Sequence, residues 1–145
     1  KLRGQTPDYS FISADLVRGK EVWRMVSAVL DDEPVRGRVR DPLARSFVRT
    51  LATLERFLAG EAPHAELFAH LRSCADCLVE GGYDVVAFDT ISIWRTLVLL
   101  GYIAVAGGDE QLLMLPLGDA IRATDMPTSK RLIREVQQAI TETHL

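Results

Sequence analysis

Two cysteines in a C-x-x-C spacing are the residues whose types most directly suggest chemistry. Cys74 and Cys77 are the only cysteines among 145 residues, and they stand in the stretch RSCADCLVE at positions 72–80. A structural zinc site needs about four ligands. The chain has no second cysteine pair, and His70 would raise the number only to three. A redox pair normally opens a helix that follows a strand, and no strand leads into this one. We therefore expect both cysteines to pack in a core, with no metal and no cofactor.

Other catalytic patterns are missing from the sequence. There is no P-loop, no G-x-G-x-x-G fingerprint and no G-x-S-x-G elbow. Asp31-Asp32-Glu33 and Asp109-Glu110 are acidic clusters, but both stand in predicted loops beside Pro or Gly, where solvated turn charges are common. General acid and base catalysis needs paired groups in a shielded pocket. We expect a protein that is not an enzyme.

Basic and aromatic residues are interleaved in the first 40 positions. The basic residues there are Lys1, Arg3, Arg18, Lys20, Arg24, Arg36, Arg38 and Arg40. The rings of Tyr9, Phe11 and Trp23 lie among them, and single-stranded DNA requires cations for its phosphates and flat faces for its bases. In an extended backbone the alternating arginines of RGRVRDP would all point to one side. Two alternatives stay open: the rings belong to the core of a sheet, and RGRVRDP is a solvated linker.

A smaller basic group stands near the C-terminus. Lys130, Arg131 and Arg134 lie beside an apolar stripe at helical spacing. Such a surface could receive an acidic, hydrophobic peptide, and the alternative is a solvated helix face.

Composition limits the class of protein. A hydrophobic fraction of 48% with 26% charged residues is ordinary for a globular chain and fits neither disorder, collagen nor a coiled coil. No apolar run approaches the ~20 residues that cross a bilayer. With two cysteines and no secretory signal in the given sequence, we expect reduced thiols in the cytoplasm.

The net charge of −3 argues against a protein that coats nucleic acid through bulk positive charge, but the charges are unevenly distributed. Residues 1–40 carry eight basic and six acidic side chains, residues 41–125 carry six and twelve, and residues 126–145 carry three and two. A polyanion should therefore meet the ends of the chain.

The hydrophobic pattern predicts two kinds of structure. Residues 9–17 and 21–30 are rich in β-branched and aromatic residues around a turn at Arg18-Gly19-Lys20, which indicates a β-hairpin. Two strands cannot bury their own faces and the chain has no initiating Met, so we expect it to begin inside a longer protein.

From Asp41 the period becomes helical. We expect one helix from Asp41 to Gly60, a second from Pro63 to Gly81 and a nearly uncharged third over 84–100 in the middle of a bundle. Residues 105–119 should form a loop with one strand or helical turn, and Thr128 or Ser129 should cap a last helix. The predicted fold is mainly α: a helical bundle domain at 34–145, preceded by a hairpin at 1–33.

Three segments resemble the bacterial recombination mediators of the RecO family. KLRGQTPDYSFISADLVRGKEVWRMVSAVL is similar to the closing part of that family's N-terminal OB-fold, and REVQQAITETHL to its short C-terminal helix. IWRTLVLLGYIA is similar to its helix signature ending in Leu-Gly-Tyr, with Arg95 where an Arg is frequent. The resemblance implies that 1–33 is the end of a truncated OB-fold and 34–145 a RecO-like α-helical domain.

The resemblance also implies a function in recombinational DNA repair. RecO-like proteins bind single- and double-stranded DNA, anneal complementary strands, partner RecR, and engage the acidic tail of single-strand binding protein so that the recombinase can load. We accordingly expect a cytoplasmic, nucleoid-associated DNA-binding protein in which Arg95, Lys130, Arg131 and Arg134 meet partners.

This chain departs from the family pattern at three places. No four-cysteine zinc module follows Leu-Gly-Tyr, Ser92 replaces a usual aromatic, and Asp89 and Thr90 stand where some members have basic residues linked to tail binding. The alternative is a helical protein–protein interaction module that does not bind DNA.

Overall fold

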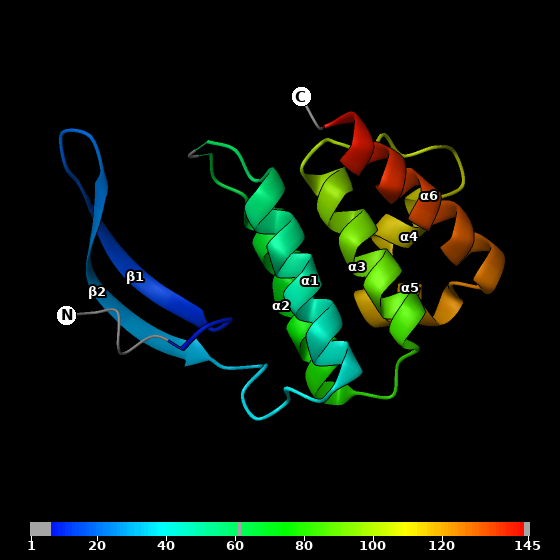
Figure 1. Ribbon diagram of the computed structural model, residues 1–145, viewed down its shortest axis with the longest axis horizontal. Helices are drawn as coiled ribbons and strands as arrows, with labels where there is room; N and C mark the ends of the chain where they lie inside the picture. The colour runs from blue at the N-terminus through cyan, green and yellow to red at the C-terminus, as the bar shows by residue number, and fades with distance from the viewer. Residues whose placement is uncertain (1–6, 61, 144–145) are drawn as a thin grey trace. The chain divides into compact units, whose positions relative to one another are not determined.

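The computed structural model describes residues 7–60 and 62–143, and the chain divides into two compact units, Lys1–Val39 and Arg40–Leu145. The described residues form a two-stranded antiparallel hairpin in the first unit and six helices in the second (Figure 1). The predicted fold class, mainly α with a leading hairpin, is confirmed. Within the described ranges no helix is long and apolar enough to cross a membrane.

The hairpin consists of β1 (Phe11–Arg18) and β2 (Trp23–Asp32). Residues 19–22 join the strands, and the Gly19 N–H donates to the Val22 carbonyl oxygen at 2.9 Å. The strands pair Ile12 with Leu30 and Arg18 with Trp23. The register shifts twice along β1, between residues 11 and 12 and between residues 15 and 16. The hairpin predicted from the sequence is therefore present, with each strand ending one or two residues later than expected.

The hairpin has one apolar and one polar face, because side chains alternate across a strand and directly paired residues share a face. The apolar face carries Ile12, Ala14, Leu16, Met25, Ala28 and Leu30. On the polar face the Ser13 hydroxyl donates to Asp31 Oδ2 at 2.8 Å, and the Ser27 hydroxyl donates to Asp15 Oδ2. Leu16 is 53% exposed, as expected for two strands that cannot cover their own apolar face.

The second unit is built around one central helix. Its helices are α1 (Pro42–Phe57), α2 (Ala65–Glu80), α3 (Val85–Leu99), α4 (Glu110–Met114), α5 (Leu117–Ala123) and α6 (Met126–Glu142). Helix α3 packs against α1, α2, α5 and α6. The side chains of Phe88, Ile91, Trp94 and Leu97 on α3 are fully buried. The central place predicted for this nearly uncharged helix is confirmed.

The helix starts follow from capping chemistry. The Asp41 carboxylate accepts from the Leu43 N–H at 2.9 Å with Pro42 in the first turn, as the sequence predicts. The start predicted for α6 is wrong: Asp125, rather than Thr128 or Ser129, is the cap, and its carboxylate accepts from the Thr128 N–H at 2.8 Å. The helix begins before Thr128 because Pro127 is tolerated in the first turn, where the backbone N–H that proline lacks would have no partner within the helix.

Candidate nucleic-acid interface

Four side chains surround the closed end of the hairpin: Arg18, Lys20, Trp23 and Arg24, here called the tip cluster. Strand pairing sets Arg18 opposite Trp23, and the Arg18 guanidinium lies 5.6 Å from the centre of the Trp23 ring. Trp23 is 46% exposed. A large ring that belonged to a core would be covered, so Trp23 is not a core residue of the described structure. All three cations are exposed. The tip cluster thus offers positive charge and one half-exposed aromatic ring that already contacts Arg18.

The tip cluster is not neutralised within the described part of the chain. Arg18, Lys20 and Arg24 make no ion pair with any described residue, and Glu21 is the only carboxylate in the segment 17–24. Two other hairpin carboxylates, Asp15 and Asp31, accept serine hydroxyls on the polar face. Positive potential therefore gathers at the tip in a protein whose net charge is negative.

The arginines at 36, 38 and 40 do not form the predicted ladder. Residues 34–37 form a turn, in which the Arg36 N–H donates to the Glu33 carbonyl oxygen at 3.1 Å and Gly37 has a φ of 72°. Arg36 Nη1 lies 2.6 Å from Glu33 Oε2. Arg38 is partly buried, and Arg40 belongs to the helical unit. The prediction of an extended backbone was wrong because Pro34 and the left-handed Gly37 bend the chain.

Lys1 and Arg3, the two other cations predicted to bind DNA, lie outside the described residues.

The cysteines of α2 are buried, as predicted from their place in the apolar stripe. Cys74 Sγ lies 3.6 Å from Ser92 Oγ and 3.7 Å from His70 Nε2, and both cysteines are free thiols. Burial raises the pKa of the Cys74 thiol to about 12 and also raises the pKa of Cys77. Thiolates are the reactive and metal-binding form, so these thiols are poorly placed for either role. Among the described residues no group of three or more His, Cys, Asp and Glu could hold a metal ion.

Arg131 of the predicted basic edge is held by carboxylates. Its two terminal nitrogens each lie 2.6 Å from one oxygen of Asp109, and Nη1 lies 2.8 Å from Glu135 Oε1. Asp109 is buried, and its two carboxylate oxygens are paired with the two terminal nitrogens of Arg131. The carboxylate that the sequence shows in an acidic cluster therefore has a structural partner. Lys130 and Arg134 are exposed. Two of the three edge cations therefore remain available to a partner.

Arg95, the remaining predicted partner residue, is 7% exposed and binds the backbone at the end of α4. Its Nη2 donates to the carbonyl oxygens of Leu112 and Leu115, while its Nε has no partner. The side chain borders a groove of about 600 Å³ between α2, the end of α3 and residues 113–117. Arg95 lines this groove together with Leu99 and Leu113, a combination that could receive a carboxylate attached to an apolar group.

In comparisons with known proteins, no family model, no curated protein and no solved structure matches the chain.

Proposed function

We propose that this protein binds single- and double-stranded DNA through the tip cluster and acts as a recombination mediator of the RecO kind, annealing strands and assisting recombinase loading. One observation carries the proposal. At the end of the hairpin, Arg18 shares a face with the exposed Trp23 ring, Lys20 lies in the connecting turn and Arg24 lies on the other face, and none of these cations makes an ion pair with a described residue. The resemblance of the hairpin and of the Leu-Gly-Tyr helix to RecO-like proteins supports the same reading.

The expected mode of binding follows from the groups present. Each phosphate neutralised by Lys or Arg releases a counterion, so the affinity falls steeply with salt. For three contacts on a single strand, the logarithm of the binding constant should fall with a slope of roughly −2 against the logarithm of the salt concentration. Trp23 adds stacking that every base can provide, so the tip cluster itself should show little sequence preference.

Fluorescence anisotropy of a labelled single-stranded oligonucleotide across a salt series tests the proposal. Arg24→Gln should weaken binding and make the salt slope shallower by about 0.7. Arg45→Gln is the matched control, because Arg45 is an exposed arginine of α1 without an ion pair in the described structure and its loss changes the net charge equally. A folded protein that fails to bind at the lowest salt would refute the proposal.

The mediator activity needs its own measurement. Complementary strands with a donor and an acceptor dye should anneal faster with the protein, and the acceleration should decline with Arg18→Gln and with Arg24→Gln. Binding without any acceleration would leave a DNA-binding protein and remove the annealing step from the proposal.

The groove beside Arg95 favours a second candidate, a helical module that binds a protein. The Arg95 side chain and the apolar walls suit a partner with a carboxylate on an apolar segment, as in the acidic tail of single-strand binding protein. A RecR-like protein is the other partner to test. A labelled peptide of that tail should bind the wild type and bind Leu113→Asp less tightly. If the protein bound the peptide and did not bind DNA at the lowest salt, the protein-interaction module would be supported in place of the DNA-binding function.

A further inference from the structure

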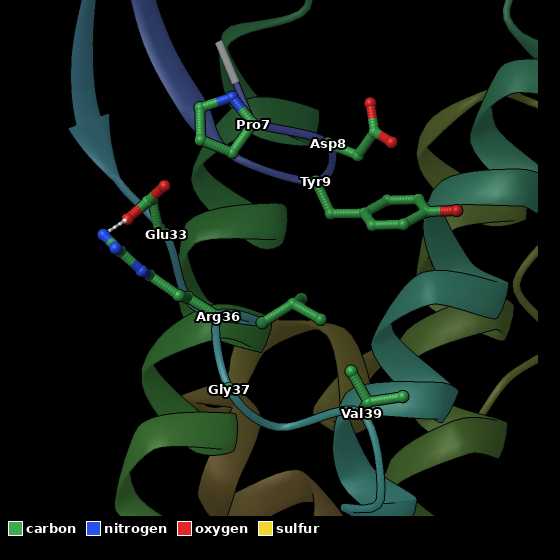
Figure 2. Close-up of a pocket in the computed structure, with 8 residues that line it drawn as sticks. Pro7, Asp8, Tyr9, Glu33, Arg36, Gly37 and Val39 are labelled. Carbon is green, nitrogen blue, oxygen red and sulfur yellow. Dashed lines mark hydrogen bonds and ion pairs between the residues drawn. The ribbon is translucent and has the colours of Figure 1, made fainter. Parts of the chain in front are cut away.

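A second exposed aromatic residue lies at the open end of the hairpin, away from the tip cluster in sequence and in strand register. Tyr9 precedes β1 and borders a hollow of about 490 Å³ in the first unit (Figure 2). The hollow is lined by Pro7, Asp8, Tyr9, Glu33, Val35, Arg36, Gly37 and Val39. The segments before β1 and after β2 therefore build one concave surface.

The backbone of Tyr9 is unusual. With a φ of 61° it is the only non-glycine residue at positive φ in the described part of the chain. A bulky side chain rarely adopts this left-handed conformation, because Cβ approaches the following carbonyl oxygen. Burial of the ring does not offset the strain, since the residue is 49% exposed. Core packing therefore does not explain an aromatic residue at this position, and strained residues of this kind collect at ligand sites.

The other walls of the hollow supply an apolar surface and charge. Figure 2 shows the Tyr9 ring extended above the Val39 side chain, with the Glu33–Arg36 ion pair on the other side of the hollow. The Arg36 side chain is 79% exposed, so its guanidinium can meet a further anion while it stays paired with Glu33. Asp8 is exposed beside the ring. A flat face, a cation and carboxylate acceptors thus surround one space.

We propose that this hollow receives one unpaired nucleobase of single-stranded DNA, stacked on Tyr9, with the adjoining phosphate at Arg36. The inference rests on the proposed function and adds to it a second contact, made to a base. Carboxylates accept hydrogen bonds from exocyclic amino groups, as Asp and Glu do from cytosine N4. The site therefore takes a base with an amino group, cytosine in particular, in preference to thymine.

Two substitutions at one position separate the ring from the backbone. Tyr9→Asn removes the ring and keeps the left-handed conformation, which Asn tolerates better than Tyr, so the fold is retained. Tyr9→Phe keeps the ring. Against oligo-dC, Tyr9→Asn should weaken binding about 5- to 150-fold, the usual range for the loss of one stacking platform. Tyr9→Phe should bind like the wild type, and the wild type should bind oligo-dC more tightly than oligo-dT.

An oligomer of abasic sugar-phosphate units provides the matched ligand. It keeps the phosphates and has no base, so the wild type and Tyr9→Asn should bind it equally, with the salt dependence set by the tip cluster. An oligonucleotide with 2-aminopurine should lose more fluorescence on binding the wild type than on binding Tyr9→Asn, in which Trp23 is the remaining proposed stacking ring.

The outcomes distinguish the two proposals. Equal binding of oligo-dC by the wild type and Tyr9→Asn, together with weaker binding by Arg24→Gln, would overturn the base site and leave the tip cluster in place. The same would follow if Tyr9→Asn lost as much affinity for the abasic oligomer as for oligo-dC. Failure of the wild type to bind any oligomer would overturn both.

Discussion

The buried histidine of α2 should make the stability of the helical unit depend on pH. His70 is 7% exposed, and its Nε2 lies 3.0 Å from the Ser92 carbonyl oxygen. Because a carbonyl oxygen only accepts, Nε2 carries the proton of a neutral ring. The pKa of His70 is lowered from 6.5 to about 4, chiefly by burial; the bond to the Ser92 carbonyl oxygen opposes this shift, and the nearby Arg95 guanidinium adds to it. The Cys74 thiol is a further titratable neighbour, with Sγ 3.7 Å from His70 Nε2.

The sign follows from proton linkage. Between pH 6.5 and about 4 the unfolded chain binds a proton at His70 that the folded protein does not. The stability is therefore complete above pH 6.5 and declines as the pH falls through this window. A shift of this size corresponds to about 3 kcal/mol in full, at about 1.4 kcal/mol per pKa unit, and to about 2 kcal/mol by pH 5.

Urea unfolding at several pH values measures this contribution. Other groups also titrate, so the informative quantity is the difference between the wild type and His70→Gln, whose amide can still donate to Ser92 but cannot be protonated there. The wild type should lose about 2 kcal/mol more than His70→Gln between pH 7 and pH 5. Cys74→Ala is the control: it removes a buried neighbour and should keep the full pH dependence. Parallel pH curves for the wild type and His70→Gln would refute the assignment of a neutral, buried imidazole.

Three further predictions concern packing in the helical unit. Both thiols should react slowly with a thiol reagent in the folded protein and rapidly in denaturant, because Cys74 and Cys77 are buried and their pKa values are raised. Rapid reaction of both thiols in the folded protein would contradict this. Gly118→Ala should lower the melting temperature, because the added Cβ would lie 2.5 Å from the Tyr83 hydroxyl oxygen. Adding Tyr83→Phe should recover part of the loss, and an equal melting temperature for the wild type, the single variant and the double variant would exclude the clash. Asp84→Ala should cost about 1 kcal/mol in urea unfolding, since its carboxylate caps α3 by accepting from the Ala87 N–H at 2.8 Å, whereas Asp84→Asn should cost much less.

The helices were predictable because their signals are local. An Asp before Pro42 caps a helix whatever surrounds it, and the apolar period of α3 already demanded contacts on most sides. The short helices α4 and α5 were less predictable, because each is too brief to show a period and α4 buries no residue of its own. Their place depends on Arg95, which binds the carbonyl oxygens of Leu112 and Leu115 from another helix.

The candidate site was predictable in its residue types and less so in its geometry. The turn residues Gly19 and Lys20 predicted the hairpin. From the hairpin it followed that Arg18 and Arg24 would flank its closed end. The pairing of Arg36 with Glu33 depends on a turn that alternating arginines do not reveal. The φ of Tyr9 has no signal in the sequence, because Tyr is among the residues least expected at positive φ.

The distribution of charge, rather than the net charge, decides whether this protein can bind DNA. In the described structure, Asp109 is paired with Arg131, and the hairpin carboxylates Asp15 and Asp31 accept serine hydroxyls and make no ion pair with a cation of the tip cluster. Three cations and one ring give a contact that is weak and sensitive to salt. A weak contact suits the proposed mediator, because a protein that anneals strands must release the duplex it has formed. If Arg24→Gln and Arg45→Gln weakened binding equally, the overall charge would govern and the tip cluster would have no special role.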